Sequence, residues 1–189
     1  ILNAQLAYER TKRKVIFADK PSNAVYWIAA LTQTFPMTIA KSITFTTYSQ
    51  DPANSRFVLN HTLSEGTRFD FQNSRARDFQ YYVFDIQSNS CSQIKDDYQF
   101  VDFAPFAFLI TEKKLVDFQQ FLKQFNYEIA GEELDYALGL FNVLTKNTKY
   151  ESIDLASLKH YIEFITKYDK GQVAKQWIDL IQQPGNTYH

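Results

Sequence analysis

Three aspartates follow predicted strands and could form one site. Asp19, Asp51 and Asp85 each lie at or just beyond the carboxyl end of a short β-rich run. In an open α/β sheet, ligands bind outside the carboxyl ends of the strands. Carboxylates gathered there, with Thr46 and Thr47 nearby, can bind a divalent metal or act as general acid and base. Asp is also a favoured turn and capping residue, which is the structural alternative, and Asp85 joins the site only if its strand runs in the same direction.

The common catalytic and phosphate-binding motifs are absent from the sequence. Its five glycines form neither G-x-G-x-x-G nor G-x-x-x-x-G-K-[ST], so neither usual phosphate-binding loop is present. There is no H-E-x-x-H motif, no Cys/His cluster and no G-x-S-x-G elbow. We interpret His61 as a hydrogen-bonded loop residue and His160 as a surface residue, and His189 stands far from both. We therefore assign no metal ligands, no cofactor-binding residues and no cofactor.

Composition and charge narrow the range of partners. The formal net charge is -1, whereas nucleic acid and anionic membranes attract proteins with an excess of Lys and Arg. The basic residues at 10 and 12–14 are interpreted as favourable charge at the end of a helix, with nucleic-acid contact as the weaker alternative. Cys91 is the only cysteine, so no intrachain disulfide can form. No transmembrane run or signal peptide is visible, and we expect a cytoplasmic protein with protein partners and with no nucleic-acid or membrane partner.

Short β-rich runs around one apolar helix indicate an α/β lobe over residues 1–108. A strand at 14–19, a helix at 24–35 and a strand at 42–48 form a βαβ unit, so the two strands are expected to be parallel. The helix is apolar nearly all round and is expected to be covered on more than one side. Further strands are predicted at 56–60, 67–72 and 81–86, before a polar loop at 87–99.

A change to helical periodicity after Pro105 indicates a second lobe over residues 109–189. Apolar faces predict four helices, within 115–125, 134–144, 155–165 and 173–181. Loops of four to eight residues suit an antiparallel array. The expected fold is α+β or α/β, with a small mixed sheet followed by a bundle of about four helices.

Helix ends and aromatic residues give three further expectations. Residues 1–13 are interpreted as the end of an upstream helix, because the chain does not begin with Met and is expected to be part of a longer protein. Ser22 or Asn23 is expected to cap the first-lobe helix, and Ser152 the third helix of the second lobe. The second lobe has more aromatic residues than one buried stripe needs, so part of them could form a docking face instead of core.

The run from Val15 to Pro52 resembles the middle region of the bacterial GTPase-associated protein 1 family. The matching pieces include Val15–Asp19, Trp27–Leu31 and, most specifically, Ile43-Thr44-Phe45-Thr46-Thr47-Tyr48-Ser49-Gln50-Asp51-Pro52. The resemblance implies a large cytoplasmic protein that is encoded with a GTPase and acts in bacterial defence or conflict signalling. It supplies no catalytic residues that could be carried over to this sequence.

Two functions follow from these observations. The first is a non-enzymatic interaction or scaffold module of a larger GTPase-associated protein, whose partners are a GTPase or other domains of the same parent protein. The alternative is a metal-dependent enzyme or small-ligand-binding α/β domain that uses Asp19, Asp51 and Asp85. This alternative predicts the three carboxylates close together around a pocket, where their pKa values would be coupled.

Overall fold

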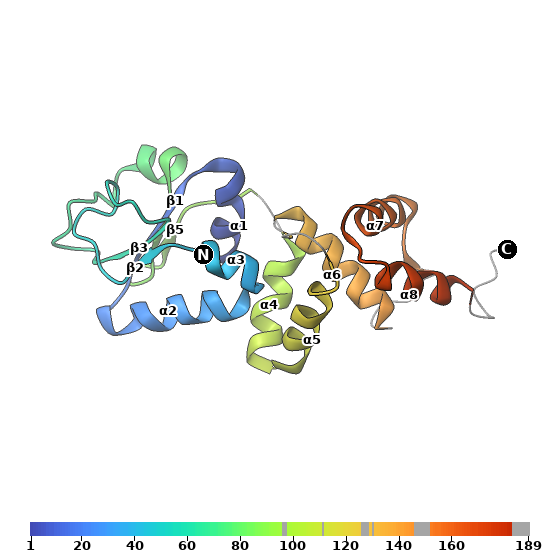
Figure 1. Ribbon diagram of the computed structural model, residues 1–189. Helices are drawn as coiled ribbons and strands as arrows, with labels where there is room; N and C mark the ends of the chain where they lie inside the picture. Colours follow the sequence, from blue (N-terminus) through green and yellow to red (C-terminus); the bar gives the residue numbers. More distant parts are fainter. Residues whose placement is uncertain (96–97, 111, 126–128, 130, 146–151, 183–189) are drawn as a thin grey trace. The chain divides into compact units, whose positions relative to one another are not determined.

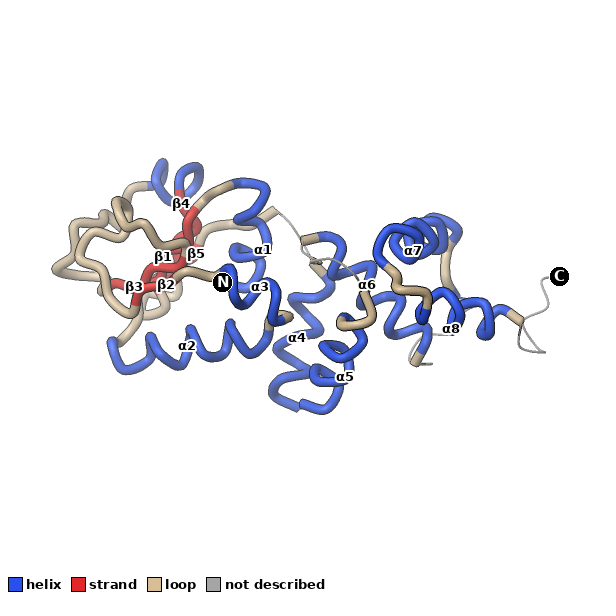
Figure 2. Tube along the Cα trace, in the orientation of Figure 1, coloured by secondary structure: helices blue, strands red, loops and turns tan. Residues whose placement is uncertain are grey.

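The computed structural model describes residues 1–95, 98–110, 112–125, 129, 131–145 and 152–182. The chain divides into two compact units, Ile1–Val101 and Asp102–His189. Figure 1 labels the helices and strands of both units. Among the described residues, the five strands of the sheet all belong to the first unit, and the second unit is built from helices (Figure 2).

The first unit contains a mixed five-stranded sheet, which confirms the predicted fold class. The strands are β1 (Lys14–Ala18), β2 (Phe45–Thr46), β3 (Leu59–Thr62), β4 (Tyr81–Asp85) and β5 (Ser90–Cys91). Their order across the sheet is β2-β3-β1-β4-β5. The strands β1 to β4 all run in the same direction, and β5 runs antiparallel to β4. The central strand β1 is buried from Val15 to Ala18, as its unbroken β-rich run predicts.

The βαβ unit is present in altered form. β1 and β2 run in the same direction, but β3 lies between them and pairs with both. A short helix, α3 (Met37–Ser42), occupies the start of the expected strand at 42–48, so β2 is reduced to two residues. The strand expected at 56–60 begins three residues later, at Leu59. The loop expected at 87–99 contains β5.

Residues 67–72 form no strand, although their sequence alternates. Phe69 is buried, and its ring packs edge-on against Phe71 at 5.0 Å and Tyr81 at 5.7 Å. These contacts place Phe69 and Phe71 on the same side of the chain, as the alternation of a strand would. Here a loop that packs on the sheet, and not a strand, produces this pattern. A π-helical turn, Ala76–Gln80, follows this loop and leads into β4.

The helices of the first unit begin with α1 (Leu2–Thr11) and α2 (Pro21–Thr34). Pro21 opens α2 at a position where its missing N–H is not needed. Neither Ser22 nor Asn23 caps the helix, which corrects that prediction, because the Asn23 side chain bonds to Asp19 instead.

Only one face of α2 is buried, so the prediction that this helix is covered on more than one side is wrong. The buried face consists of Ala24, Ile28, Leu31 and Thr34. Val25 is 58% exposed and Tyr26 is 74% exposed. The helix therefore presents apolar side chains to solvent beside the buried face.

The second unit carries the four predicted helices and the end of one more. These are α4 (Gln99–Ile110), α5 (Glu112–Leu122), α6 (Glu132–Leu144), α7 (Leu155–Tyr168) and α8 (Gln172–Ile181). The sequence predicted no helix where α4 lies, but the end of a loop and the boundary between the two lobes. Pro105 lies inside this helix. At the start of α7 the cap is Asp154, which accepts from the Ser157 amide at 2.9 Å, and not Ser152.

Aromatic side chains form the core of the second unit. Phe141 contacts Phe118 at 5.5 Å and Phe121 at 5.6 Å between ring centroids. Phe125 links Phe121 to Phe164, at 5.2 Å and 5.0 Å. All five rings are buried, so this part of the aromatic surplus is core and not docking face. Tyr127 and Tyr150, two other aromatics of this surplus, lie outside the described residues.

Candidate functional site

Asp19 and Asp85 lie at the same edge of the sheet, at the carboxyl ends of two adjacent parallel strands. Asp19 directly follows β1, and Asp85 is the last residue of β4. The register places Ala18 opposite Asp85, and β1 and β4 run in the same direction. This edge is where open α/β sheets bind ligands.

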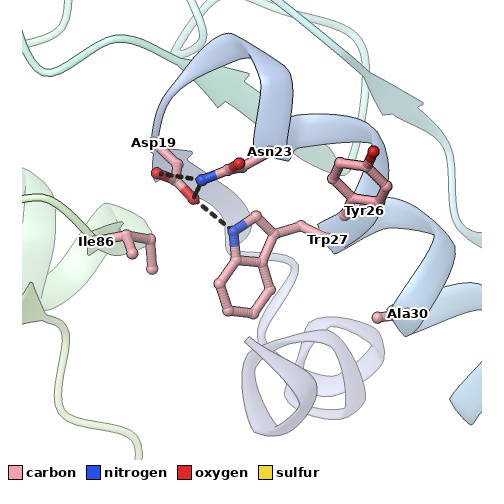
Figure 3. A pocket seen from close by; sticks show the side chains of 6 residues that line it. All are labelled: Asp19, Asn23, Tyr26, Trp27, Ala30 and Ile86. Carbon is pink, nitrogen blue, oxygen red and sulfur yellow. Dashed lines mark hydrogen bonds between the residues drawn. The ribbon is translucent and has the colours of Figure 1, made fainter.

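The carboxylate of Asp19 is held by donors from the next eight residues of the chain, which include the first turns of α2. The Lys20 amide donates to Oδ1 at 2.7 Å. Nδ2 of Asn23 lies 3.2 Å from both oxygens, and the indole Nε1–H of Trp27 donates to Oδ2 at 2.7 Å. Asn23 and Trp27 are four residues apart, so they share a helix face and both reach back to the strand end (Figure 3).

These contacts favour the ionised form of Asp19. Burial opposes ionisation, but the hydrogen bonds from Trp27, Lys20 and Asn23 together outweigh it, so the pKa of Asp19 lies below its ordinary value. The three donors are all neutral, and no Lys or Arg among the described residues forms an ion pair with this carboxylate. Asp19 therefore contributes a negative charge that no Lys or Arg of the described residues pairs with, although the charge interaction with His61 also helps to lower its pKa.

A pocket of about 450 Å³ opens beside this carboxylate. Its lining consists of Asp19, Asn23, Tyr26, Trp27, Ala30 and Ile86. Ile86 stands on one side of the Trp27 indole and Tyr26 and Ala30 on the other, and the indole nitrogen points at Asp19 (Figure 3). The volume is within the range of small-molecule sites, which combine apolar walls with a few polar groups. We call these six residues the Asp19 pocket.

Asp85 and Asp51 do not join Asp19 in a metal site. Asp85 accepts from the Ser64 hydroxyl at 2.9 Å; its burial raises its pKa, but hydrogen bonds from Ser88 and Ser64 outweigh burial and lower it. Asp51 is bonded within its own turn, to the amide and side chain of Asn54. Within the described ranges, no group of three or more His, Cys, Asp or Glu side chains could hold a metal ion.

His61 is a buried strand residue, so its interpretation as a loop residue is wrong. It belongs to β3 and is fully buried. Its Nδ1 lies 2.5 Å from the Thr47 carbonyl oxygen and its Nε2 lies 3.1 Å from the Asp19 carbonyl oxygen. The ring also packs on Phe17 at 5.1 Å. His61 thus ties the chain after β2 to the end of β1 beneath the pocket's carboxylate.

The other two histidines lie elsewhere. The His160 side chain is partly exposed, as predicted, and stacks on Tyr136 with 4.9 Å between ring centroids. His189 lies outside the described residues.

The basic residues after α1 have local structural partners. Lys12 pairs with Glu9 at 2.7 Å. The Arg13 guanidinium donates to the Tyr81 carbonyl oxygen at 2.6 Å and lies 4.1 Å from the centre of the Tyr82 ring. Lys14 donates to main-chain carbonyl oxygens at residues 53 and 55. Two of the cations that could contact phosphate are therefore turned towards the protein's own backbone.

Sequence reasoning did not assign Asn23, Tyr26 and Trp27 to a site. It treated Asn23 as a cap and Trp27 as part of an apolar helix. A signal was nevertheless present, because Asp19, Asn23 and Trp27 follow one another at intervals of four residues. That spacing places an amide and an indole N–H on the helix face above a strand-end carboxylate.

Within the described residues, no helix has the length and apolar character that crossing a membrane requires.

Comparison with known proteins supports the resemblance. No curated protein and no solved structure matches the chain. The family model described as "GTPase-associated protein 1, middle domain" matches residues 1–88. This range includes the strands β1 to β4 and the helix α2, and it ends before β5. The resemblance inferred from Val15 to Pro52 is thereby confirmed, because residues 1–88 match the model of this middle domain.

Proposed function

We propose that this chain is a non-enzymatic interaction module of a larger bacterial, cytoplasmic, GTPase-associated protein. Its partner is a GTPase or another domain of the same parent protein, and its role is to bring components of a defence or conflict-signalling assembly together. The family description, which names association with GTPases, supports this proposal. So does the absence from the sequence of the usual catalytic motifs.

The exposed side of α2 is the observation that carries the proposal. Val25 and Tyr26 are adjacent, more than half exposed, and lie next to a pocket on the same helix. Exposed apolar and aromatic side chains beside a concave surface are typical of protein-binding sites, and Tyr is enriched among residues that dominate binding energy. A helix that only had to cover the sheet would carry polar residues at these two positions.

The charges near this surface favour a protein partner over a nucleic acid. The pocket contains an ionised carboxylate, which repels phosphate. Arg13 and Lys14 donate to backbone carbonyl oxygens instead of facing outward as a basic patch. Phosphate contacts supply most of the affinity of non-specific nucleic-acid binding, and Arg13 and Lys14 are already engaged with the protein's own backbone.

The test is titration calorimetry of the 189-residue chain with the GTPase encoded beside it, loaded in turn with GDP and with a non-hydrolysable GTP analogue. We expect saturable binding in at least one nucleotide state. The double substitution Val25→Ser with Tyr26→Ser is expected to weaken it about tenfold or more, because aromatic anchors dominate interfaces.

Leu155→Ser is the matched control, because Leu155 is 80% exposed but belongs to α7 in the second unit. This variant is expected to bind like the unaltered chain. Absence of binding in both nucleotide states, with no binding to the remaining domains of the parent protein either, contradicts the proposal. Equal weakening by both variants contradicts the assignment of the surface to α2.

A second candidate is a small-ligand-binding α/β domain, which the Asp19 pocket favours by its volume and its position at the strand ends. The metal-dependent form of this alternative has weaker support, because Asp51 is bonded within its own turn. Calorimetric titration with Mg²⁺ separates the two forms. Binding that Asp19→Asn and Asp85→Asn both abolish would favour the metal-dependent form.

A further inference from the structure

We infer that the Asp19 pocket receives an arginine side chain of the protein partner. This inference rests on the proposed function and names the chemistry by which the partner is recognised. It combines three observations: an ionised carboxylate that forms no ion pair with a Lys or Arg of the described residues, an indole that the carboxylate holds in place, and apolar walls on both sides of that indole.

The charge of the pocket selects a cation. Asp19 is almost completely buried and its pKa is lowered, yet its donors are neutral groups of residues 20, 23 and 27. Hydrogen bonds from neutral dipoles stabilise a carboxylate without cancelling its charge, so the field of Asp19 extends into the pocket beside it. In a partly desolvated pocket this field favours a positive group more strongly than it would in open water.

The hydrogen bonds at Asp19 favour a guanidinium over an ammonium. Oδ1 already accepts from Lys20 and Asn23, and Oδ2 accepts from Trp27 and Asn23. A cation that enters the pocket therefore has few free carboxylate lone pairs to bind. A Lys ammonium is strongly hydrated and would lose water without gaining acceptors, whereas a guanidinium is weakly hydrated and can stack on an aromatic face.

The walls of the pocket suit the rest of an arginine side chain. Trp27 supplies the indole, and Trp is the best aromatic partner for a cation. Its nitrogen is turned to Asp19, so the indole is fixed before any ligand binds. Ala30 and Ile86 supply apolar surface for the methylene stem, and Tyr26 stands at the exposed side.

The experiment uses the 189-residue chain labelled with ¹⁵N at its tryptophan indoles. The sequence has two tryptophans, Trp27 and Trp177, so the spectrum contains two indole signals, which Trp→Phe variants assign. The probes are acetyl-Gly-Arg-Gly-amide and the same peptide with citrulline, which has nearly the same shape and no charge. We expect the arginine peptide to shift the Trp27 signal saturably, with an affinity about tenfold higher than that of the citrulline peptide. The Trp177 signal, from the second unit, is expected to stay in place.

Two substitutions at one position test the charge without disturbing Asp19. Ile86 is partly exposed and lines the pocket. Ile86→Lys places a competing cation there and is expected to weaken the arginine peptide several-fold, while Ile86→Glu is expected to strengthen it. Equal binding of the arginine and citrulline peptides, an absence of any Trp27 shift, or equal effects of Lys and Glu at position 86 would each overturn the inference.

The same two variants separate this inference from the proposed function. If the GTPase binds the chain and both Ile86 variants bind it equally well, the pocket does not receive a basic side chain of the partner, and the interaction module stands. If the arginine peptide binds and neither the GTPase nor the other parent domains do, the proposed partner is wrong and the pocket still recognises a guanidinium.

Discussion

The indole N–H of Trp27 donates to Oδ2 of Asp19 at 2.7 Å, which joins the middle of α2 to the end of β1. One hydrogen bond thus fixes an aromatic ring at the place where an open α/β sheet binds ligands. The same bond favours the ionised form of the Asp19 carboxylate. The bond therefore matters both for the stability of the first unit and for the shape of its pocket.

We predict that Trp27→Phe lowers the free energy of unfolding by about 1–3 kcal/mol, because a buried carboxylate loses a charge-assisted hydrogen bond. Urea denaturation followed by circular dichroism measures the change. Tyr26→Ser is the matched control, since Tyr26 is 74% exposed on the same helix, and it should stay within about 0.5 kcal/mol of the unaltered chain. A Trp27→Phe variant as stable as the control would show that this hydrogen bond contributes little.

Acid is expected to destabilise the first unit through Asp19 and Asp85. Both carboxylates have a pKa below the ordinary value in the folded chain, despite burial, because of the hydrogen bonds that they accept. The unfolded chain therefore binds more protons, and the stabilisation is present above about pH 4 and is lost as the pH falls through the lowered values. Urea midpoints measured between pH 7 and pH 3 should fall less steeply for Asp19→Asn than for Asp117→Asn, which alters an exposed residue of α5. Equal slopes would contradict the assignment.

His61→Phe is predicted to be strongly destabilising. Phenylalanine fills a similar volume but leaves the buried carbonyl oxygen of Asp19 and the part-buried carbonyl oxygen of Thr47 without the histidine ring as a partner. We expect a loss of about 2 kcal/mol or more in chemical denaturation, from the cost of unsatisfied buried acceptors. His160→Phe alters a partly exposed histidine and should change stability by no more than about 0.5 kcal/mol. A neutral His61→Phe would mean that neither contact is worth more than the packing of the ring.

Gly139 on α6 is predicted to be required by Tyr161 on α7. A Cβ at position 139 would lie 2.8 Å from Cζ of Tyr161 and closer still to its hydroxyl. We expect Gly139→Ala to destabilise the second unit by about 1–3 kcal/mol, as overpacking does. In a Tyr161→Ala background the same change should stabilise the helix by up to about 1 kcal/mol, through the better helix propensity of Ala. A double-mutant cycle with no coupling between the two positions would contradict this account.

The sequence predicts those elements best whose local pattern and tertiary surroundings agree. β1 and β4 are continuous β-rich runs, and both are strands. The run Ser42–Tyr48 is also β-branched, but α3 extends into it and β2 covers only its middle. Phe69 and Phe71 alternate because a loop packs them on Tyr81, which a pattern of period two cannot distinguish from a strand.

The candidate site was predicted in part. The strand-end rule brings Asp19 and Asp85 to one edge, and the parallel pairing of β1 and β4 gives the strand direction that sequence alone left open. The strand-end rule also placed Asp51 at this edge, but the Asp51 side chain bonds to Asn54, three residues further along the chain. Turn contacts of this kind are local, and an Asp in a turn has the same sequence pattern whether or not it faces a ligand.

The burial of α2 is the largest difference between the sequence-based prediction and the structure. An apolar helix beside a sheet predicts burial on several sides, whereas only the face with Ala24, Ile28, Leu31 and Thr34 is buried. Val25 and Tyr26 are free to contact another protein, and this is the surface on which the proposed function depends.

The most direct test of that function is the indole spectrum of the ¹⁵N-labelled chain during titration with its GTPase. Trp27 lines the pocket on α2, and Trp177 is buried in the second unit. We predict that the Trp27 signal shifts or broadens and saturates with the GTPase, while Trp177 responds only through the slower tumbling of the complex. A complex that forms with the Trp27 chemical shift unchanged, or a GTPase that leaves both signals as they were, would contradict the account.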